Sequence, residues 1–115
     1  MKIGIVITMY DEHSIVLKTV KEVKQHFEGT NIILVHSNNN QESESLRELK
    51  KITEYILLPD MSERIAELEN ANPVIIRNFN TGFSKLYELS SDYDLIIALT
   101  GDTLIQDATS FTRRY

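Results

Sequence analysis

The sequence predicts an α/β fold with three layers: a mostly parallel central sheet and helices on both of its faces. Short runs of β-branched residues alternate along the chain with longer stretches in which apolar residues recur every three or four positions. Residues 3–8 form an apolar run, as expected for a strand that is covered on both faces. Because strands that alternate with helices pair in parallel through crossover connections, we expect right-handed β-α-β units.

Length and composition narrow the class of protein. A chain of 115 residues favours one domain over residues 1–115, and its formal net charge of −5 argues against a general nucleic-acid binder. The absence of Cys excludes disulfides, thiolate zinc sites and cysteine nucleophiles. No apolar run reaches about 18 residues and the start lacks a signal-peptide pattern, so we expect a cytoplasmic protein without a transmembrane segment.

The first half of the chain predicts strands at residues 3–8 and 32–35, each followed by a helix. Asp11 stands where it would cap the first helix, and Gly29 where it would end it. The buried stripe of this helix is Val16, Val20, Val23 and Phe27. A polar loop at residues 37–40 precedes the next helix, whose stripe is Leu46, Leu49 and Ile52.

The second half predicts a short strand at residues 55–58, a strand at 74–76 that Pro73 opens, and the most apolar strand at 95–99. Asp60 and Glu63 have the spacing of a capping box. The helix after them would bury Met61, Ile65 and Leu68. A last short helix would follow a turn at residues 80–83 and bury Phe83, Leu86 and Leu89.

The candidate binding loops follow from this order. In such sheets, ligands bind outside the carboxyl ends of the strands, where the strand order reverses. The loops at these ends are residues 8–12, 36–40, 77–82 and 100–103, and all are polar. Among the histidines, His13 and His26 fall within the first helix and are expected to be solvated, whereas His36 lies at a carboxyl end.

Taken in order, these loops resemble the nucleotide-binding half of the family 2 glycosyltransferases, which have the GT-A fold. Residues 7–12 read Ile-Thr-Met-Tyr-Asp-Glu, similar to the turn after the family's first strand, and residues 34–39 match its second strand and loop. Residues 80–83 match the family's Asn-x-Gly-Phe turn. Residues 91–102 match the strand that leads to its Asp-x-Asp metal motif. The chain would then be a fragment or a minimal version of the donor-binding half.

The resemblance has departures. His36 and Ser37 stand where the family usually has Asp, and only Asp102 remains of the metal motif. The family's acceptor half, which usually carries the catalytic base, has no counterpart before Tyr115. The resemblance therefore implies donor binding without complete catalysis, and glycosyltransferase activity only if the full protein carries an acceptor half. The sequence leaves open whether the protein forms an oligomer.

The resemblance implies a nucleotide-diphospho-sugar donor, such as a UDP-sugar, with Mg²⁺ or Mn²⁺ held by Asp102. The residues that would bind the nucleotide and its phosphates are Thr8, Tyr10, Glu12, Ser37, Asn38, Asn80 and Gly82. Arg77 and Lys85 are the cations near the 80–83 turn and are open to pairing with phosphate.

Each candidate also has a structural explanation. Asp102 is equally suited to cap a turn, and Asp11 and Glu12 suit the first turn of a helix. A receiver-like signalling domain, with Asp11, Glu12 and Asp60 around a phospho-acceptor, is an alternative from another class. One observation argues against the receiver-like alternative. The last strand ends in Thr100 and a Gly, at the place where such domains have a Lys. A non-catalytic scaffold with the same layered fold is a third interpretation.

Overall fold

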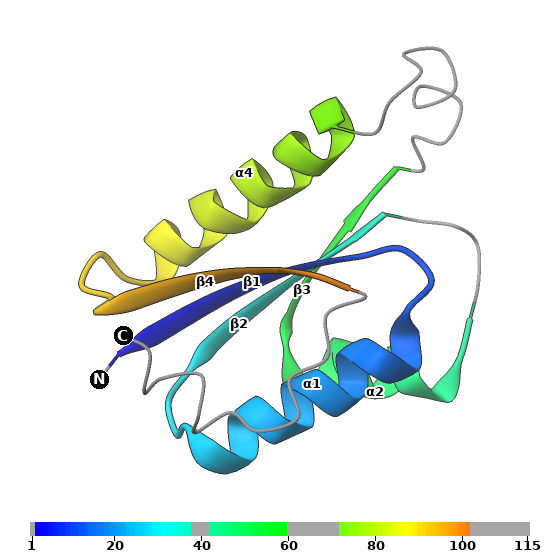
Figure 1. Ribbon diagram of the computed structural model, residues 1–115, viewed down its shortest axis with the longest axis horizontal. Coiled ribbons are helices and arrows are strands. Elements are labelled where there is room, and N and C mark those ends of the chain that lie inside the picture. Colours follow the sequence, from blue (N-terminus) through cyan, green and yellow to red (C-terminus); the bar gives the residue numbers. More distant parts are fainter. Residues whose placement is uncertain (1, 38–41, 60–71, 102–115) are drawn as a thin grey trace.

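The structure is a computed structural model that describes residues 2–37, 42–59 and 72–101. Its elements are β1 (Ile3–Met9), α1 (His13–His26), β2 (Asn31–Ser37), α2 (Glu44–Ile52), β3 (Glu54–Leu58), α4 (Asn72–Leu89) and β4 (Leu95–Thr100). The strands form one four-stranded sheet in the order β3-β2-β1-β4, and every neighbouring pair is parallel. The predicted α/β class with a parallel sheet is confirmed (Figure 1).

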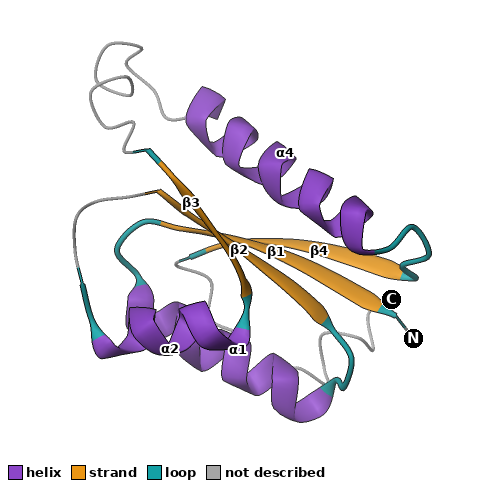
Figure 2. Cartoon of the chain, turned by 180° about the vertical axis from the view of Figure 1, so that it is seen from behind, coloured by secondary structure: helices purple, strands orange, loops and turns teal. Residues whose placement is uncertain are grey.

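Helices cover both faces of this sheet. Helices α1 and α2 lie on one face and α4 crosses the other, as both views show (Figures 1 and 2). Side chains along a strand point alternately to the two faces, so β1 divides its residues between two cores. Ile3, Ile5, Ile7 and Met9 join the core on the α1 and α2 side. Val6 joins the core on the α4 side, where Leu86 is buried. Burial on both faces explains why residues 3–8 read as an apolar run.

The two helices on the first face use the predicted stripes. Val16, Val20 and Val23 of α1 and Leu46 and Leu49 of α2 are buried. The predicted partners at the ends of these stripes, Phe27 and Ile52, pack against the same core.

The ends of α1 and the start of α2 differ in how they are capped. Ser43 caps α2, because its hydroxyl accepts a hydrogen bond from the amide of Leu46 at 3.0 Å. The expectation that Asp11 caps α1 is wrong, since Glu12 occupies the N-cap position and makes no capping hydrogen bond. Gly29, two residues after the C-cap of α1, has a φ of 73°, as expected for a glycine that ends a helix.

Helix α4 is the main departure from the prediction. Residues 74–76, expected as a strand, lie within this 18-residue helix, and so do residues 80–83, expected as a turn. Periodicity does not distinguish a three-residue apolar run in a strand from one in a buried helix. A Pro is tolerated in the first turn of a helix, where its missing amide has no partner to lose. The strand expected at 55–58 is confirmed as β3, and the helix expected after Asp60 lies outside the described residues.

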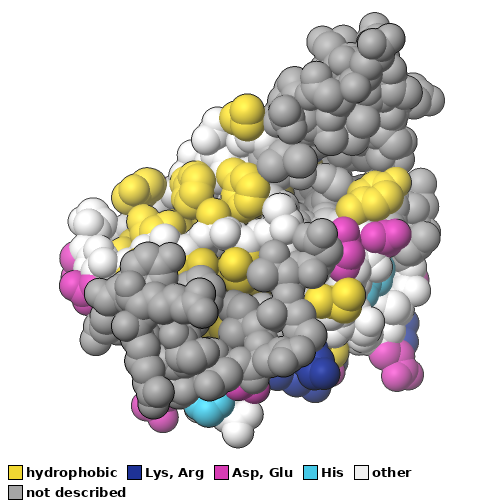
Figure 3. Space-filling view, viewed as in Figure 1, with side chains coloured by type: hydrophobic (Ala, Val, Ile, Leu, Met, Phe, Trp, Pro, Cys, Tyr) yellow, Lys and Arg dark blue, Asp and Glu magenta, His cyan; other side chains and the backbone are white. Residues whose placement is uncertain are grey.

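A Gly at position 82 allows α4 to lie directly on the sheet. A Cβ at Gly82 would overlap with Cγ1 of Val6 and lie 3.2 Å from Cγ2 of Val35. The outer face of α4 is partly apolar, and Figure 3 shows apolar side chains gathered over this helix. Among residues 76–89 of α4, the exposed large apolar residues are Ile76, Tyr87 and Leu89. Within the described ranges, no helix has the length and apolar character needed to cross a membrane.

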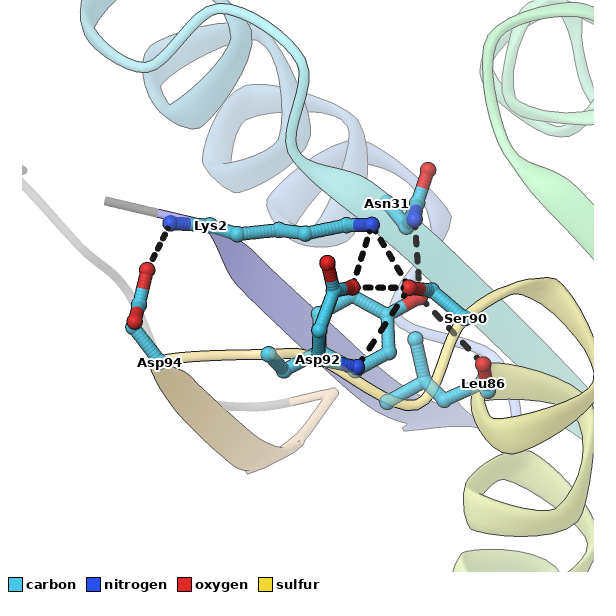
Figure 4. Close-up of polar contacts among 7 residues, drawn as sticks. Lys2, Asn31, Leu86, Ser90, Asp92 and Asp94 are labelled. Carbon is cyan, nitrogen blue, oxygen red and sulfur yellow. Dashed lines mark hydrogen bonds and ion pairs between the residues drawn. The ribbon is translucent and has the colours of Figure 1, made fainter.

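Polar contacts around Lys2 fasten the amino end of β1 to the segment between α4 and β4 (Figure 4). Its Nζ donates to Oγ of Ser90 at 2.6 Å and pairs with Oδ1 of Asp92 at 2.7 Å, while its backbone amide donates to Asp94 at 2.6 Å. The hydrogen bonds from Lys2 and Ser90 lower the pKa of Asp92. This cluster lies at the amino end of the sheet, so its role is structural rather than part of the predicted site.

Candidate functional site

The strand order places the candidate site between β1 and β4. From β1 the chain adds β2 and β3 on one side and then crosses to place β4 on the other side of β1. The strand order therefore reverses between β1 and β4, and open α/β sheets bind ligands at the carboxyl ends of the strands at such a point. Thr8 and Thr100 are paired across these two ends.

A carboxylate, Glu12, lies at the carboxyl ends of these two strands. Its Oε2 accepts hydrogen bonds from the backbone amides of Tyr10 at 2.8 Å and Asp11 at 3.2 Å. A Cβ at Gly101 would lie 2.8 Å from the same Oε2 and 3.0 Å from the carbonyl oxygen of Thr8. Any residue larger than Gly at position 101 would displace the carboxylate. The segment after β4 thus packs directly against Glu12, whose carboxylate oxygens accept hydrogen bonds.

A buried histidine supports the loop that carries Glu12. Nε2 of His36 lies 3.0 Å from the carbonyl oxygen of Tyr10, and Nδ1 lies 2.5 Å from the hydroxyl of Tyr55. A carbonyl only accepts, so we assign the proton to Nε2 and the Tyr55 hydroxyl as donor to Nδ1. Burial lowers the pKa of His36, as do the nearby charges of His13 and Lys50, against the opposing effect of the Tyr10 carbonyl. The neutral imidazole therefore satisfies both of its nitrogens.

His13 completes this buried polar cluster. The expectation that it is solvated is wrong: His13 is buried, because α1 turns this first residue toward the sheet. Its Nδ1 lies 2.8 Å from Oγ of Ser43, and its ring stands edge-on to that of His36 with centroids 5.4 Å apart. Its Nε2 is buried with no hydrogen-bond partner. The cluster links the loop after β1 to the starts of α1 and α2.

A second polar network lies on the α4 face. Asn78 of α4 is 5% exposed, and its Nδ2 donates to Oγ of Ser37 at 2.9 Å. Its Oδ1 accepts from Nε of Arg77 at 3.1 Å and from Nη2 at 2.8 Å. Ser37 is the last residue of β2, so this network brings a guanidinium to the same carboxyl edge as Glu12.

The structure brings together some of the residues predicted for the nucleotide site. Thr8, Tyr10, Glu12 and Ser37 all lie at the carboxyl edge of the sheet, at the ends of β1 and β2 or in the loop between β1 and α1. Asn38 and Asp102 lie outside the described residues.

The predicted residues Asn80 and Gly82 are placed differently, inside α4. Asn80 is exposed, and Gly82 faces Val6. Within a helix, a backbone amide such as that of Gly82 bonds to the carbonyl four residues earlier, so it does not cradle a phosphate.

The sequence did not single out Asn78 or Tyr55. Asn78 is a polar residue on the sheet-facing side of a helix, and Tyr55 is a Tyr in a short strand. Both patterns are common in sequences, and the hydrogen-bond partners that give these residues a role are visible only in the structure. Among the described residues, no group of three or more His, Asp or Glu side chains is arranged to hold a metal ion. Comparison of the chain with models of known protein families and with curated proteins finds no match.

Proposed function

We propose that this chain is a glycosyltransferase-like domain that binds a nucleotide-diphospho-sugar donor at the carboxyl edge of its sheet. The observation that carries the proposal is the strand order β3-β2-β1-β4, with Glu12 held at the carboxyl ends of β1 and β4. Doubly wound nucleotide-binding sheets share this order and bind their ligand at this position. The resemblance of the loops to family 2 glycosyltransferases is the reason to propose that this nucleotide is part of a nucleotide-sugar donor.

The chemistry of the loop after β1 suits a nucleoside. The Glu12 carboxylate accepts hydrogen bonds, and the hydroxyls of a ribose donate them. Tyr10 is 39% exposed beside it and has an aromatic face on which a base can stack. Thr8 and Ser37 supply hydroxyls at the ends of the neighbouring strands.

Binding of the diphosphate requires a positive charge nearby to offset electrostatic repulsion, because the chain is acidic overall. Mg²⁺ or Mn²⁺ held by Asp102 would supply it and would stabilise the leaving diphosphate in a complete enzyme. Asp102 lies outside the described residues, so the metal is carried by the resemblance alone. We expect Asp102→Ala to cost roughly 1–3 kcal/mol of UDP binding in the presence of Mn²⁺. We also expect the chain alone to show no sustained donor turnover above a heat-inactivated control.

The receiver-like alternative fits the strand order less well. In a receiver domain, the first strand lies between the second and the third. Here β1 lies between β2 and β4, and β3 pairs with β2. A scaffold without a ligand would keep the same fold, and a binding experiment separates it from the proposed function.

Calorimetric titration of UDP and GDP, with and without Mn²⁺, tests the proposal on the wild type, Glu12→Gln and Asp11→Asn. Both substitutions remove one negative charge from neighbouring residues, but only Glu12 lies against Gly101. We expect Glu12→Gln to weaken UDP binding about 10-fold or more, because a hydrogen bond to a charged acceptor is lost, and Asp11→Asn to leave it unchanged. Equal effects of the two variants would place the nucleotide elsewhere, and no binding at millimolar nucleotide would favour the scaffold.

A further inference from the structure

We propose that Arg77 forms an anion site at the carboxyl edge of β2 that takes a phosphate group of the bound ligand. Under the proposed function, on which this assignment of the ligand rests, the group belongs to the diphosphate of the donor. The site consists of the guanidinium of Arg77, the side chain of Asn78 and the hydroxyl of Ser37.

The guanidinium is fixed in position by a buried group. Asn78 accepts from Nε and Nη2 of Arg77, and its own amide nitrogen is tied to Ser37 at the end of β2. A buried amide is costly unless it is hydrogen-bonded, and here both of its polar atoms are used. An exposed Arg would lose side-chain entropy when it binds an anion, whereas Arg77 has already lost much of it.

The contacts with Asn78 leave the outer edge of the Arg77 guanidinium, which suits an anion, without a bond to this residue. Arg carries five N–H donors, and the contacts with Asn78 use one on Nε and one on Nη2. The contacts with Asn78 leave both hydrogens of Nη1 and the second hydrogen of Nη2. One hydrogen of Nη1 and the remaining hydrogen of Nη2 form the parallel pair of donors that matches two oxygens of a phosphate. None of the ion pairs among the described residues includes Arg77, although Lys2, Lys21, Arg47 and Lys85 all have carboxylate partners.

The site is adjacent to the proposed nucleotide site. Ser37 follows His36, which pairs with Met9 in the sheet, so Arg77 is anchored beside the start of the loop that carries Tyr10 and Glu12. Glu12 suits the uncharged, hydrogen-donating part of a nucleotide and repels its phosphates. A positive charge on the α4 side of the same edge would favour the phosphates there. The two charges would orient a nucleotide at the edge of the sheet.

The test is calorimetric titration of UDP, uridine and inorganic pyrophosphate into the wild type, Arg77→Gln and Lys85→Gln. The expectation that Lys85 can pair with a phosphate depended on a turn at residues 80–83, and the structure places those residues inside α4. Lys85 lies about two helical turns from Arg77 on α4 and pairs with Glu88 at 3.5 Å, so Lys85→Gln is a control for the loss of one positive charge. We expect Arg77→Gln to weaken UDP and pyrophosphate roughly 10- to 100-fold and to leave uridine unchanged, because a charge-assisted pair is lost. Lys85→Gln should bind all three as the wild type does. Circular dichroism on each variant reports the folded fraction, and Arg77→Lys, which keeps the charge without the paired donors, replaces Arg77→Gln if the latter fails to fold. In that case the expected loss of pyrophosphate binding is partial.

The outcomes separate this inference from the proposed function. UDP binding that is equal in the wild type and the Arg77 variants overturns the anion site and leaves the nucleotide site intact. If pyrophosphate binding depends on Arg77 and uridine does not bind, the result supports the anion site and contradicts the nucleotide site. If neither UDP nor pyrophosphate binds the folded wild type at millimolar concentration, the anion site is wrong.

Discussion

The contact between Gly82 and β1 gives a sharp test of the fold. In Gly82→Ala, the new Cβ would overlap with Cγ1 of Val6 and stand 3.2 Å from Cγ2 of both Val6 and Val35. Both valines are fully buried, and β-branched side chains have few alternative rotamers, so neither moves aside without shifting the strand. Helix α4 must therefore lift away from the sheet or the core must rearrange.

Two effects of opposite sign decide the free energy of unfolding. Overpacking a core costs about 1–3 kcal/mol, and an overlap with a rigid neighbour belongs in the upper part of that range. Replacing Gly by Ala inside a helix contributes about 1 kcal/mol in the other direction. We expect Gly82→Ala to lower the free energy of unfolding by about 1–2 kcal/mol. Ser84→Ala, at an exposed position of the same helix, should raise it by a few tenths of a kcal/mol, since only helix propensity changes there.

Urea denaturation followed by circular dichroism measures these changes, and the double variant Val6→Ala/Gly82→Ala identifies their cause. Val6→Ala removes the overlapping methyl groups, so the second substitution should be tolerated better in its presence. We expect the double variant to be more stable than the sum of the single losses predicts, by at least about 0.5 kcal/mol. Gly82→Ala with wild-type stability, or strictly additive losses, would refute the close packing of α4 on β1.

Three further predictions concern single residues. The pKa of His36 is lowered from 6.5, so just below that pH the unfolded chain binds more protons than the folded chain. The contribution of His36 to the free energy of unfolding should therefore be full above about pH 6.5 and decrease as the pH falls. Urea midpoints measured between about pH 5 and 8 should decrease less with falling pH in His36→Gln than in the wild type. Ser43→Ala removes the N-cap of α2 and should lower the free energy of unfolding by about 1 kcal/mol, read from the thermal midpoint, and an unchanged midpoint would contradict the cap. Gly29→Ala should cost about 1 kcal/mol through backbone conformation alone, because nothing lies within 4 Å of its Cβ position, and Gly29→Asn should cost less.

The parts of the fold that the sequence predicted are those with a strong local signal. Residues 3–8, 32–35 and 95–99 are apolar runs that predict strands, and all three are strands. The first two are buried on both faces, whereas β4 is only partly buried. Residues 74–76 carry the same β-branched composition, yet they lie in α4. There the decision comes from the rest of the helix, where Phe79, Phe83 and Leu86 bury one face against the sheet. A window of three residues does not contain that information.

The candidate site divides in the same way. The position of Thr8, Tyr10 and Glu12 at this edge was predictable because the residues after the first strand of a parallel sheet lie there. Their role in binding a nucleotide comes from the resemblance and stays a prediction. The order of the strands was not predictable, since it depends on how crossovers pack, and the order is what puts Gly101 against Glu12. Asn78 was missed because a buried polar residue is recognisable only from its partner, which here is 41 positions away in the chain.

Two side chains, Glu12 and His36, hydrogen-bond to the backbone of the loop after β1. Glu12 accepts the amides of Tyr10 and Asp11, while His36, from the neighbouring strand, donates to the carbonyl of Tyr10. The buried histidine pair that supports this loop leaves Nε2 of His13 without a hydrogen-bond partner, at a cost of about 1–3 kcal/mol. Under the proposed function, that cost is explained if the position of Glu12 has to be fixed before the nucleotide arrives, because a loop that is already ordered loses less entropy on binding.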